Sequence, residues 1–244
     1  MEAIEYETMH KLESSFWWYR ALHNIILDRV NQMHLPDSAK LLDAGCGTGG
    51  LLRKLHDAFP AYNLTGMEYH AEGMRHLQQL SGSSIINGDV NAMPFSDNSF
   101  DALTLTDVLY HKNVQPDKCL AECFRVLKPH GHLLVNLPAY NWMRSAHDKH
   151  VHTRERYTAS TCELQLVSAG FRIQHVGYWN SLLFPLMVIH RLTTGKLKDA
   201  SDIETLASWQ DNLFYRIIHC EQFLQRHHLH LPFGGSVWAW AIKI

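Results

Sequence analysis

Short apolar runs alternate with helical patterns along the middle of the chain. Residues 51–59 and 71–80 place apolar side chains three and four positions apart, which predicts amphipathic helices. A further helix is expected to begin near Pro116, because the proline ring suits the first turn of a helix. The apolar runs predict five strands, Lys40–Ala44, Asn63–Glu68, Ser84–Gly88, Ala102–Thr106 and His132–Leu137. This alternation indicates a parallel sheet with helices on both faces.

The end of the chain departs from this alternation. Phe171–Tyr178 and Val237–Ile244 have the pattern of strands, and residues 180–236 between them are mostly helical in pattern. Such a connection is longer than a parallel β-α-β unit requires. We therefore expect a helical insertion that caps the sheet edge or the substrate side.

Composition and charge narrow the classes of partner. Hydrophobic residues make up 46% of the 244 residues and charged residues 19%, as in an ordinary globular protein. The formal net charge is -2 and the pI is about 6.8, so no basic surface favours nucleic-acid binding.

The cysteines are odd in number and none forms a C-x-x-C pair, so neither a disulfide framework nor a zinc motif is predicted. Cys119 and Cys123 lie four positions apart on a predicted helix and are interpreted as small core residues. Free thiols favour a reducing compartment, and a cytoplasmic location is expected.

No segment has the length of a membrane span. The acidic N-terminal segment lacks the apolar centre of a signal peptide. The apolar stretch Leu182–Ile189 is far shorter than the roughly 20 residues that cross a bilayer. Peripheral membrane contact through residues 182–198 stays open as an interpretation.

A glycine-rich turn follows the first predicted strand, in the segment Leu41–Gly50 with the sequence LLDAGCGTGG. A strand, a glycine turn and a helix start together form a place where the backbone approaches a ligand closely. Gly45, Gly47 and Gly50 satisfy G-x-G-x-x-G, and Glu68 follows at a distance typical of a dinucleotide site. An NAD(P)-dependent oxidoreductase is therefore one interpretation.

Asp43 favours a different ligand. A carboxylate at the end of this strand would repel a pyrophosphate, whereas it suits a ligand that carries positive charge. S-adenosylmethionine has an ammonium and a sulfonium group and no phosphate. The order D-x-G-x-G-x-G over residues 43–49 therefore favours S-adenosylmethionine as the cofactor.

Four later segments follow in an order that resembles the class I S-adenosylmethionine-dependent methyltransferases of small molecules. They are LTGMEYH, INGDVNAMPFSDNSFD, FDALTLTDVLYH and ECFRVLKPHGHLLV, and the resemblance spans roughly residues 40–171. It implies an α/β, Rossmann-like sheet of seven strands, mostly parallel with an antiparallel last strand. Helices would cover both faces, and a helical insertion would precede the last strand.

The resemblance also implies roles for individual residues. Glu68 is expected to bond both ribose hydroxyls, Asp89 to accept from the adenine amino group, and Val90 to pack beside the ring. The other cofactor-binding residues expected from these motifs are Asp43, Gly45, Cys46, Gly47, Gly49, Tyr69, Thr106 and Asp107. The chain has Pro-His-Gly at residues 129–131 where the family has Pro-Gly-Gly. If His130 takes a positive φ there, it does so at some cost, although histidine tolerates this better than a branched residue.

Methyl transfer is an in-line displacement with a neutral leaving group, so alignment is the main task of the enzyme. A base is needed only when the nucleophile arrives protonated. His111 is predicted to line the active site, and His152 and Tyr157 in HDKHVHTRERYT are predicted to face the substrate. The alternatives are a packing role for His111 and a solvated loop that Tyr157 anchors. No metal is predicted, because these histidines share no obvious face with an acidic or thiol partner.

The N-terminal segment SSFWWYRALHNII offers further contacts. Trp18 is predicted to cover the cofactor, while Tyr19 or Arg20 would reach the methionine carboxylate. The alternative is an amphipathic helix that only packs on the sheet.

Together these features predict S-adenosylmethionine-dependent methyl transfer to a small-molecule, glycan or lipid-linked acceptor. A single domain is expected over residues 1–244, as a monomer or homodimer. Its predicted parts are an N-terminal lid over 1–38, a cofactor-binding core over 39–179, the insertion over 180–236 and the last strand over 237–244. An oxidoreductase and a non-catalytic S-adenosylmethionine-binding scaffold remain as alternatives.

Overall fold

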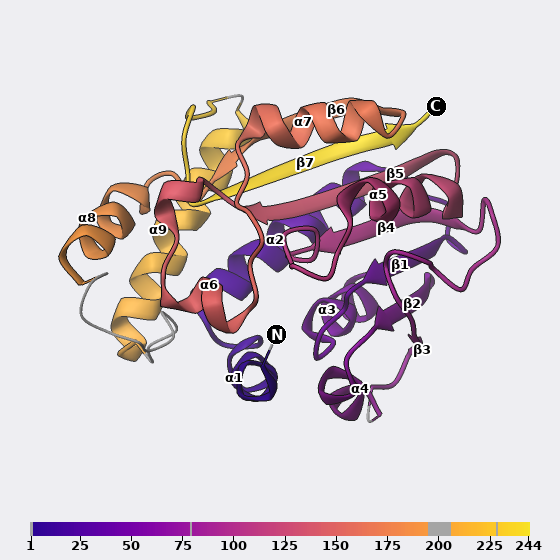
Figure 1. The fold of residues 1–244 in the computed structure, drawn as a ribbon, viewed down its shortest axis with the longest axis horizontal. Helices are drawn as coiled ribbons and strands as arrows, with labels where there is room; N and C mark the ends of the chain where they lie inside the picture. The colour runs from indigo at the N-terminus through magenta and orange to yellow at the C-terminus, as the bar shows by residue number, and fades with distance from the viewer. Residues whose placement is uncertain (1, 79, 195–205, 228) are drawn as a thin grey trace.

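The centre of the molecule is a seven-stranded sheet (Figure 1). The structure is a computed structural model that describes residues 2–78, 80–194, 206–227 and 229–244. The strands are β1 (Lys40–Ala44), β2 (Asn63–Glu68), β3 (Ser83–Asn87), β4 (Phe100–Thr106), β5 (Leu127–Pro138), β6 (Phe171–Trp179) and β7 (Ser236–Lys243). They follow the order β3-β2-β1-β4-β5-β7-β6, in which β1 to β5 pair in parallel and β7 is antiparallel to both neighbours. The predicted fold class is confirmed.

Helices cover both faces of the sheet, as the alternating pattern predicts. The helices are α1 (Ala3–Leu12), α2 (Trp17–Gln32), α3 (Gly50–Ala58), α4 (Ala71–Leu77), α5 (Pro116–Val126), α6 (Ala146–His150), α7 (Ala159–Ser168), α8 (Phe184–Thr194), α9 (Ser208–Arg226) and the short 3₁₀ turn η1 (Asn141–Met143). Helices α5 and α7 enclose one core with the sheet, whereas α2 and α3 enclose the other. Within the insertion, α9 packs on α2.

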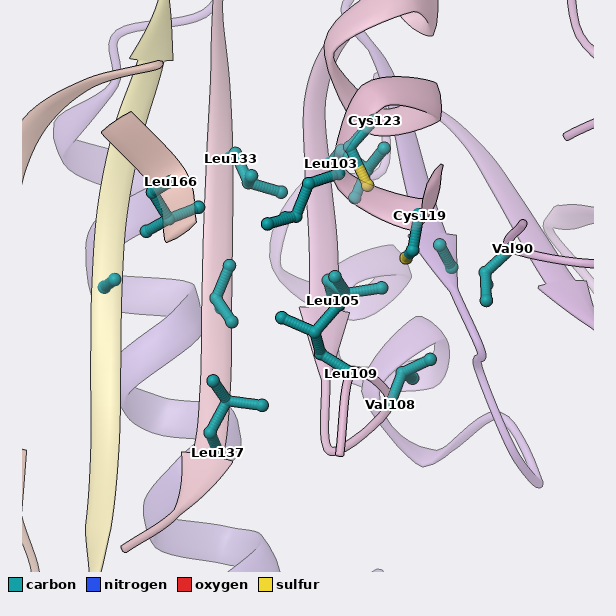
Figure 2. Close-up of a cluster of buried hydrophobic side chains, with 14 of the residues drawn as sticks. Val90, Leu103, Leu105, Val108, Leu109, Cys119, Cys123, Leu133, Leu137 and Leu166 are labelled. Atoms are coloured by element: carbon teal, nitrogen blue, oxygen red, sulfur yellow. The ribbon is translucent and has the colours of Figure 1, made fainter. Parts of the chain in front are cut away.

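The core beneath α5 and α7 contains both cysteines of α5 (Figure 2). Cys119 and Cys123 have no exposed surface and lie among Leu103 of β4, Leu133 of β5 and Leu166 of α7. The interpretation of these thiols as core residues is confirmed.

Strand β5 begins at Leu127, earlier than the His132 that the apolar pattern indicates. The Pro-His-Gly segment therefore lies inside the strand, where the pairing with β4 shifts register between Phe100 and Ala102. His130 has a φ of 64°, at the position where the family has glycine.

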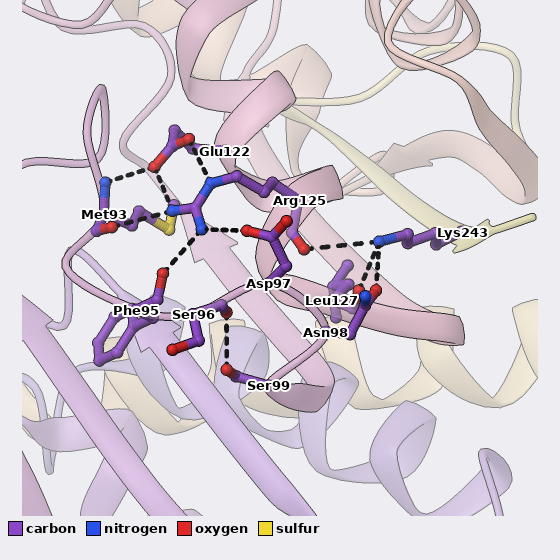
Figure 3. Close-up of polar contacts among 10 residues, drawn as sticks. All are labelled: Met93, Phe95, Ser96, Asp97, Asn98, Ser99, Glu122, Arg125, Leu127 and Lys243. Carbon is purple, nitrogen blue, oxygen red and sulfur yellow. Dashed lines mark hydrogen bonds and ion pairs between the residues drawn. The ribbon is translucent and has the colours of Figure 1, made fainter.

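Arg125 of α5 holds the segment that connects residue 89 to β4 (Figure 3). Its guanidinium donates to both carboxylate oxygens of Glu122 at 2.7 Å, to Asp97 at 2.8 Å, and to the carbonyl oxygens of Phe95 at 2.7 Å and Met93 at 3.0 Å. A planar fork of donors can satisfy these acceptors together, whereas an ammonium cannot.

Replacing Arg125 with lysine should therefore lower the free energy of unfolding by about 2 kcal/mol, because several charge-assisted bonds are lost. Amide hydrogen exchange should also become faster within residues 93–99. Chemical denaturation and exchange measurements check both effects. An Arg172→Lys variant on β6, where the side chain is exposed, is the control. Equal stabilities for the two variants would contradict the bridging role of Arg125.

Candidate functional site

A cavity of about 530 Å³ opens at the carboxyl ends of the parallel strands. Asp43, Glu68 and Thr106 line it from the ends of β1, β2 and β4, and Pro138 lines it from the end of β5. Open α/β sheets bind ligands at this edge, where strand order reverses between β1 and β4. Helices α1, α2 and α8 also contribute to the wall.

The glycine turn leaves room for a ligand between β1 and α3. Gly45 and Gly47 have φ values of 80° and 57° and line the cavity together with Cys46. A Cβ on Gly45 would come within 2.3 Å of Val108, so only glycine fits there. Gly49 has a φ of 86° but begins α3 and does not line the cavity. The prediction of a cofactor contact for Gly49 is therefore not supported, because its role is to turn the backbone into the helix.

Glu68 is a carboxylate of the cavity that both side-chain and backbone donors hold in place. Its Oε1 accepts from the Tyr6 hydroxyl at 3.0 Å and from the amides of Tyr69 and His70 at 3.0 and 2.9 Å. Its Oε2 accepts from the Gly47 amide at 3.0 Å and keeps further acceptor capacity. These bonds aim an acceptor-only group at the cavity, which fits a ligand that presents vicinal hydroxyls.

Asp43 lies deeper, with 1% of its surface exposed, and its carboxylate accepts from the Thr104 hydroxyl at 2.7 Å. Burial raises the pKa of Asp43 to about 7, and the nearby charge of Glu68 adds to this rise, while the bond from Thr104 opposes it. A cationic ligand beside Asp43 stabilises the ionised form of this carboxyl group.

The affinity for S-adenosylmethionine should therefore increase about tenfold between pH 6 and pH 8, as Asp43 loses its proton. S-adenosylhomocysteine lacks the sulfonium charge, so its affinity should depend less on pH. Titration calorimetry at several pH values measures both slopes. Asp43→Asn should flatten the slope for S-adenosylmethionine, and identical slopes for both ligands in the natural protein would contradict this role.

The segment after β3 supplies the far wall. Asp89 accepts from the amide and side chain of Asn91, each at 2.8 Å, and this turn holds Asp89 and Val90 against the cavity. Val90 is buried, whereas Tyr69 lines the cavity with 59% of its surface exposed. A carboxylate and an apolar side chain side by side fit the edge and the face of an adenine ring.

The N-terminal helices fold over this cradle. Trp18 and Tyr19 of α2 line the cavity, and Trp18 packs on Trp179 with ring centroids 5.7 Å apart. Arg20 turns away, pairing with Asp211 of α9 at 3.4 Å. Its guanidinium also lies 3.8 Å from the centre of the Tyr215 ring. The prediction that Arg20 reaches the cofactor is therefore wrong, because its charge is already satisfied by α9.

Two residues of the N-terminal segment, Tyr6 in α1 and Glu13 directly after it, were missed by the sequence analysis. Besides the bond from Tyr6 to Glu68, buried Glu13 accepts from the Thr48 hydroxyl at 2.6 Å and the Gly50 amide at 2.9 Å. No local pattern marks these residues, since their partners lie far away in the sequence.

Both histidines that the sequence analysis predicted at the active site line the cavity. His111 bonds through Nδ1 to the Val151 carbonyl at 2.7 Å, which requires a proton on that nitrogen. Burial lowers the pKa of His111 to about 4, although the bond to Val151 opposes this, so the ring is neutral at pH 7. His152 also lines the cavity, with a φ of 55°.

Tyr157 does not face the cavity. It is 1% exposed, and its hydroxyl donates to Glu155 at 3.1 Å and accepts from Arg154 at 3.3 Å. The prediction that it faces the substrate is wrong, because its ring completes the core beneath α7 and anchors the loop.

The same loop contains a buried ion pair that the sequence analysis did not select. Arg156 donates from Nε and Nη2 to the two oxygens of Asp148 at 2.8 and 2.9 Å, and both residues line the cavity. An aspartate eight positions before an arginine carries no signal of its own in a loop. Within the described residues, no cluster of three or more His, Cys, Asp or Glu could hold a metal ion.

Comparison with known proteins assigns the family. Residues 42–135 match the family model described as a methyltransferase domain. The chain is 30% identical over 166 residues to a probable S-adenosylmethionine-dependent methyltransferase of Mycolicibacterium smegmatis, covering 66% of this chain and 62% of the relative. It is 34% identical over 123 residues to cycloartenol-C-24-methyltransferase 1 of Oryza sativa, covering 48% of this chain and 34% of the relative.

Solved structures agree on the fold. An S-adenosylmethionine-dependent methyltransferase from Aquifex aeolicus has a TM-score of 0.60 at 16% identity, covering 100% of both chains. Geranyl diphosphate methyltransferase in complex with GPP and sinefungin has a TM-score of 0.63 at 17% identity, covering 93% of this chain and 78% of that one.

The sheet order and the carboxylate-lined glycine turn are those of an S-adenosylmethionine-binding α/β protein. Residues 42–135 belong to the methyltransferase-domain family, of the class I S-adenosylmethionine-dependent type. This assignment removes the oxidoreductase interpretation. The chain spans between a third and two thirds of the length of the curated relatives described above.

Proposed function

We propose that this protein transfers the methyl group of S-adenosylmethionine to a small-molecule acceptor. The observation that carries the proposal is the set of carboxylates at the ends of β1, β2 and the segment after β3, arranged around the glycine turn. Glu68 would hold the ribose hydroxyls, Asp89 and Val90 the adenine, and Asp43 the positive charge. Gly45 and Gly47 let the backbone approach the ligand.

When bound, the cofactor supplies an electrophilic methyl group on a neutral leaving group. The chain then contributes alignment, because a fixed geometry lowers the entropic part of the barrier. Trp18 and Tyr19 of α2 would exclude water from the bound cofactor. His111 and His152 would face the acceptor. Neutral His111 would orient the acceptor by a hydrogen bond.

The relatives indicate the acceptor only as a broad class of small molecules. One relative is named for cycloartenol, and another from Methylococcus capsulatus is a malonyl-[acyl-carrier protein] O-methyltransferase. We propose that the acceptor is a small molecule, a glycan or a lipid-linked intermediate. We also propose that the methylation takes place in the cytoplasm and that the protein acts as a monomer or homodimer.

Helix α8 supports peripheral contact with a lipid surface. Its side chains Leu186, Ile189 and Leu192 are 50–75% exposed, while Met187 and Arg191 line the cavity. None of the described helices has the length and apolarity to cross a membrane. Residues 195–198 of the predicted membrane segment lie outside the described part of the chain.

Titration calorimetry with S-adenosylhomocysteine, and in parallel with NAD, tests the cofactor assignment. We expect micromolar binding of the first and none of the second. Transfer of labelled methyl from S-adenosylmethionine to a panel of hydroxyl, amine and carbon acceptors then tests catalysis. Binding without transfer to any acceptor would favour the scaffold alternative, and NAD binding alone would overturn the assignment.

A further inference from the structure

Asp107 is held in an unusual backbone conformation at the wall of the cavity. It follows directly after β4, has a φ of 56° and lines the cavity. Aspartate tolerates this region better than branched residues, but it remains uncommon outside glycine. Such local strain persists only where surrounding contacts impose it, and it is concentrated at functional sites.

The contacts that impose this conformation are a chain of buried hydrogen bonds from Trp179 through Asn136 to Asp107, which we call the relay. The indole Nε1 of Trp179 donates to Oδ1 of Asn136 at 2.8 Å. Nδ2 of Asn136 donates to both carboxylate oxygens of Asp107, at 3.2 and 3.0 Å. An indole nitrogen can only donate, so the oxygen of Asn136 must face Trp179 and its amide nitrogen must face Asp107. Trp179 and Asn136 are 1% and 2% exposed, so neither can turn away into water.

The sheet places Asp107 at the edge of the cofactor cradle, because β4 pairs with β1 on one side and with β5 on the other, and the neighbouring Val108 lies against Gly45. Asp43 and Glu68 end β1 and β2, whereas Asp107 follows β4 on the side that pairs with β5. Its electrostatic neighbours are Tyr19, Tyr110 and Arg156, which belong to α2, to the loop after β4 and to the loop before α7. The carboxylate therefore lies between the cofactor cradle and the loops that carry Tyr110 and Arg156, where an acceptor would meet the cofactor.

The carboxylate of Asp107 retains unused acceptor capacity. Among the described residues, Asn136 is the one side chain that donates to it, while a carboxylate offers about four lone-pair sites. Burial raises the pKa of Asp107 to about 7, although the bond from Asn136 and the charge of Arg156 oppose this. A base of this strength is matched to neutral pH, whereas neutral His111 would be a much weaker base.

We propose that Asp107, positioned by Asn136 and Trp179, accepts the proton of the methyl acceptor, whose nucleophile is therefore an N–H or O–H group. The inference rests on the proposed function. The acceptor's lone pair forms a bond to the methyl carbon as the carbon–sulfur bond breaks and its electron pair stays on sulfur. The acceptor's proton passes to the carboxylate of Asp107 and then to water. An anionic acceptor, such as a free carboxylate, would be repelled.

Sinefungin separates this role from binding of the cofactor's own ammonium group. It carries an amine at the place of the transferable methyl, whereas S-adenosylhomocysteine carries nothing there. Asp107→Asn should weaken sinefungin at least 30-fold in titration calorimetry and change S-adenosylhomocysteine less than threefold. An almost unchanged affinity for S-adenosylhomocysteine also shows that the variant is folded.

Three other results would overturn the proposal. Equal losses for both ligands would place Asp107 against the methionine ammonium, as a cofactor-binding residue only. No loss for either ligand would place it outside the ligand site. Absence of S-adenosylhomocysteine binding in the natural protein would refute the proposed function itself, and the inference with it.

The relay is tested by the pH dependence of the same affinity ratio. The affinity for sinefungin relative to that for S-adenosylhomocysteine should increase as pH rises through about 7, because Asp107 ionises in this range. Asn136→Ala and Trp179→Phe should move this midpoint upward, because each weakens the support of the ionised form. Trp240→Phe is the matched control, since its indole donates to His132 at 3.0 Å on β5. If the midpoint of the pH dependence is the same in both variants as in the natural protein, Asn136 and Trp179 only pack around Asp107 and do not tune it.

Discussion

Replacing Glu68 with alanine should weaken S-adenosylhomocysteine binding about 100-fold, the largest loss expected from a single side chain of the cradle. Two charge-assisted hydrogen bonds to a ribose are each worth about 1.5 kcal/mol or more, and both disappear. The change also leaves the Tyr6 hydroxyl and the amide of Gly47 without their acceptor. Titration calorimetry at neutral pH measures the loss.

Two further variants separate binding from folding. Glu68→Gln keeps one acceptor oxygen and should lose about tenfold, between the natural protein and the alanine variant. Glu163→Ala, on the exposed face of α7, should leave the affinity unchanged. If Glu68→Ala bound S-adenosylhomocysteine as tightly as Glu163→Ala does, the ribose would have to be held elsewhere.

Replacing Arg156 with alanine should lower the free energy of unfolding by about 3–5 kcal/mol, the largest stability loss expected in the loop before α7. The guanidinium forms two parallel bonds to Asp148, and the two side chains are only 10% and 7% exposed. Without Arg156, the carboxylate of Asp148 remains buried with no cation beside it. The melting temperature should fall by about 10 °C or more.

The pH dependence identifies the ion pair as the cause. Burial alone would raise the pKa of Asp148, but the bonds and charge of Arg156 outweigh burial and lower it. Its contribution to stability is therefore complete above an ordinary aspartate pKa of about 3.9 and declines as pH falls below it. The difference between the natural protein and Arg156→Ala should be largest at neutral to alkaline pH and should shrink as pH falls, beginning above about pH 4, because burial without Arg156 raises the pKa of Asp148 in the variant.

Arg226→Ala is the matched control, because Arg226 pairs with Asp28 on the surface, with side chains 48% and 37% exposed. An exposed pair contributes about 1 kcal/mol or less, so this variant should change stability little. Similar losses for both arginine variants would contradict a special role for the buried pair.

The regular part of the fold was predictable because each element carries its own pattern. The apolar runs identified all five parallel strands, and the helical spacing placed α3, α4 and α5 between them. Boundaries failed where tertiary pairing extends an element, as in β5, which runs through the turn at His130. The N-terminal and C-terminal helices were expected as helices, but their packing partners were not, since α2 meets α9 across most of the chain.

Predictions for single side chains divided in the same way. Trp18 and His111 were placed near the ligand from their neighbouring motifs, and they line the cavity. Arg20 and Tyr157 carry suitable chemistry, yet Asp211 in one case and the core beneath α7 in the other turn them away. Residue type alone could not reveal those competing partners.

The sequence by itself determined the cradle, because Asp43, Glu68 and Asp89 stand at the ends of successive strands. A parallel sheet brings such ends to one edge, whatever the loops do. Only the tertiary structure decided which groups support them. Tyr6 reaches Glu68 across 62 residues, and Trp179 holds Asn136 from 43 residues away. Contacts of that range depend on how helices and strands pack against one another, and no local pattern of polar and apolar residues encodes that packing.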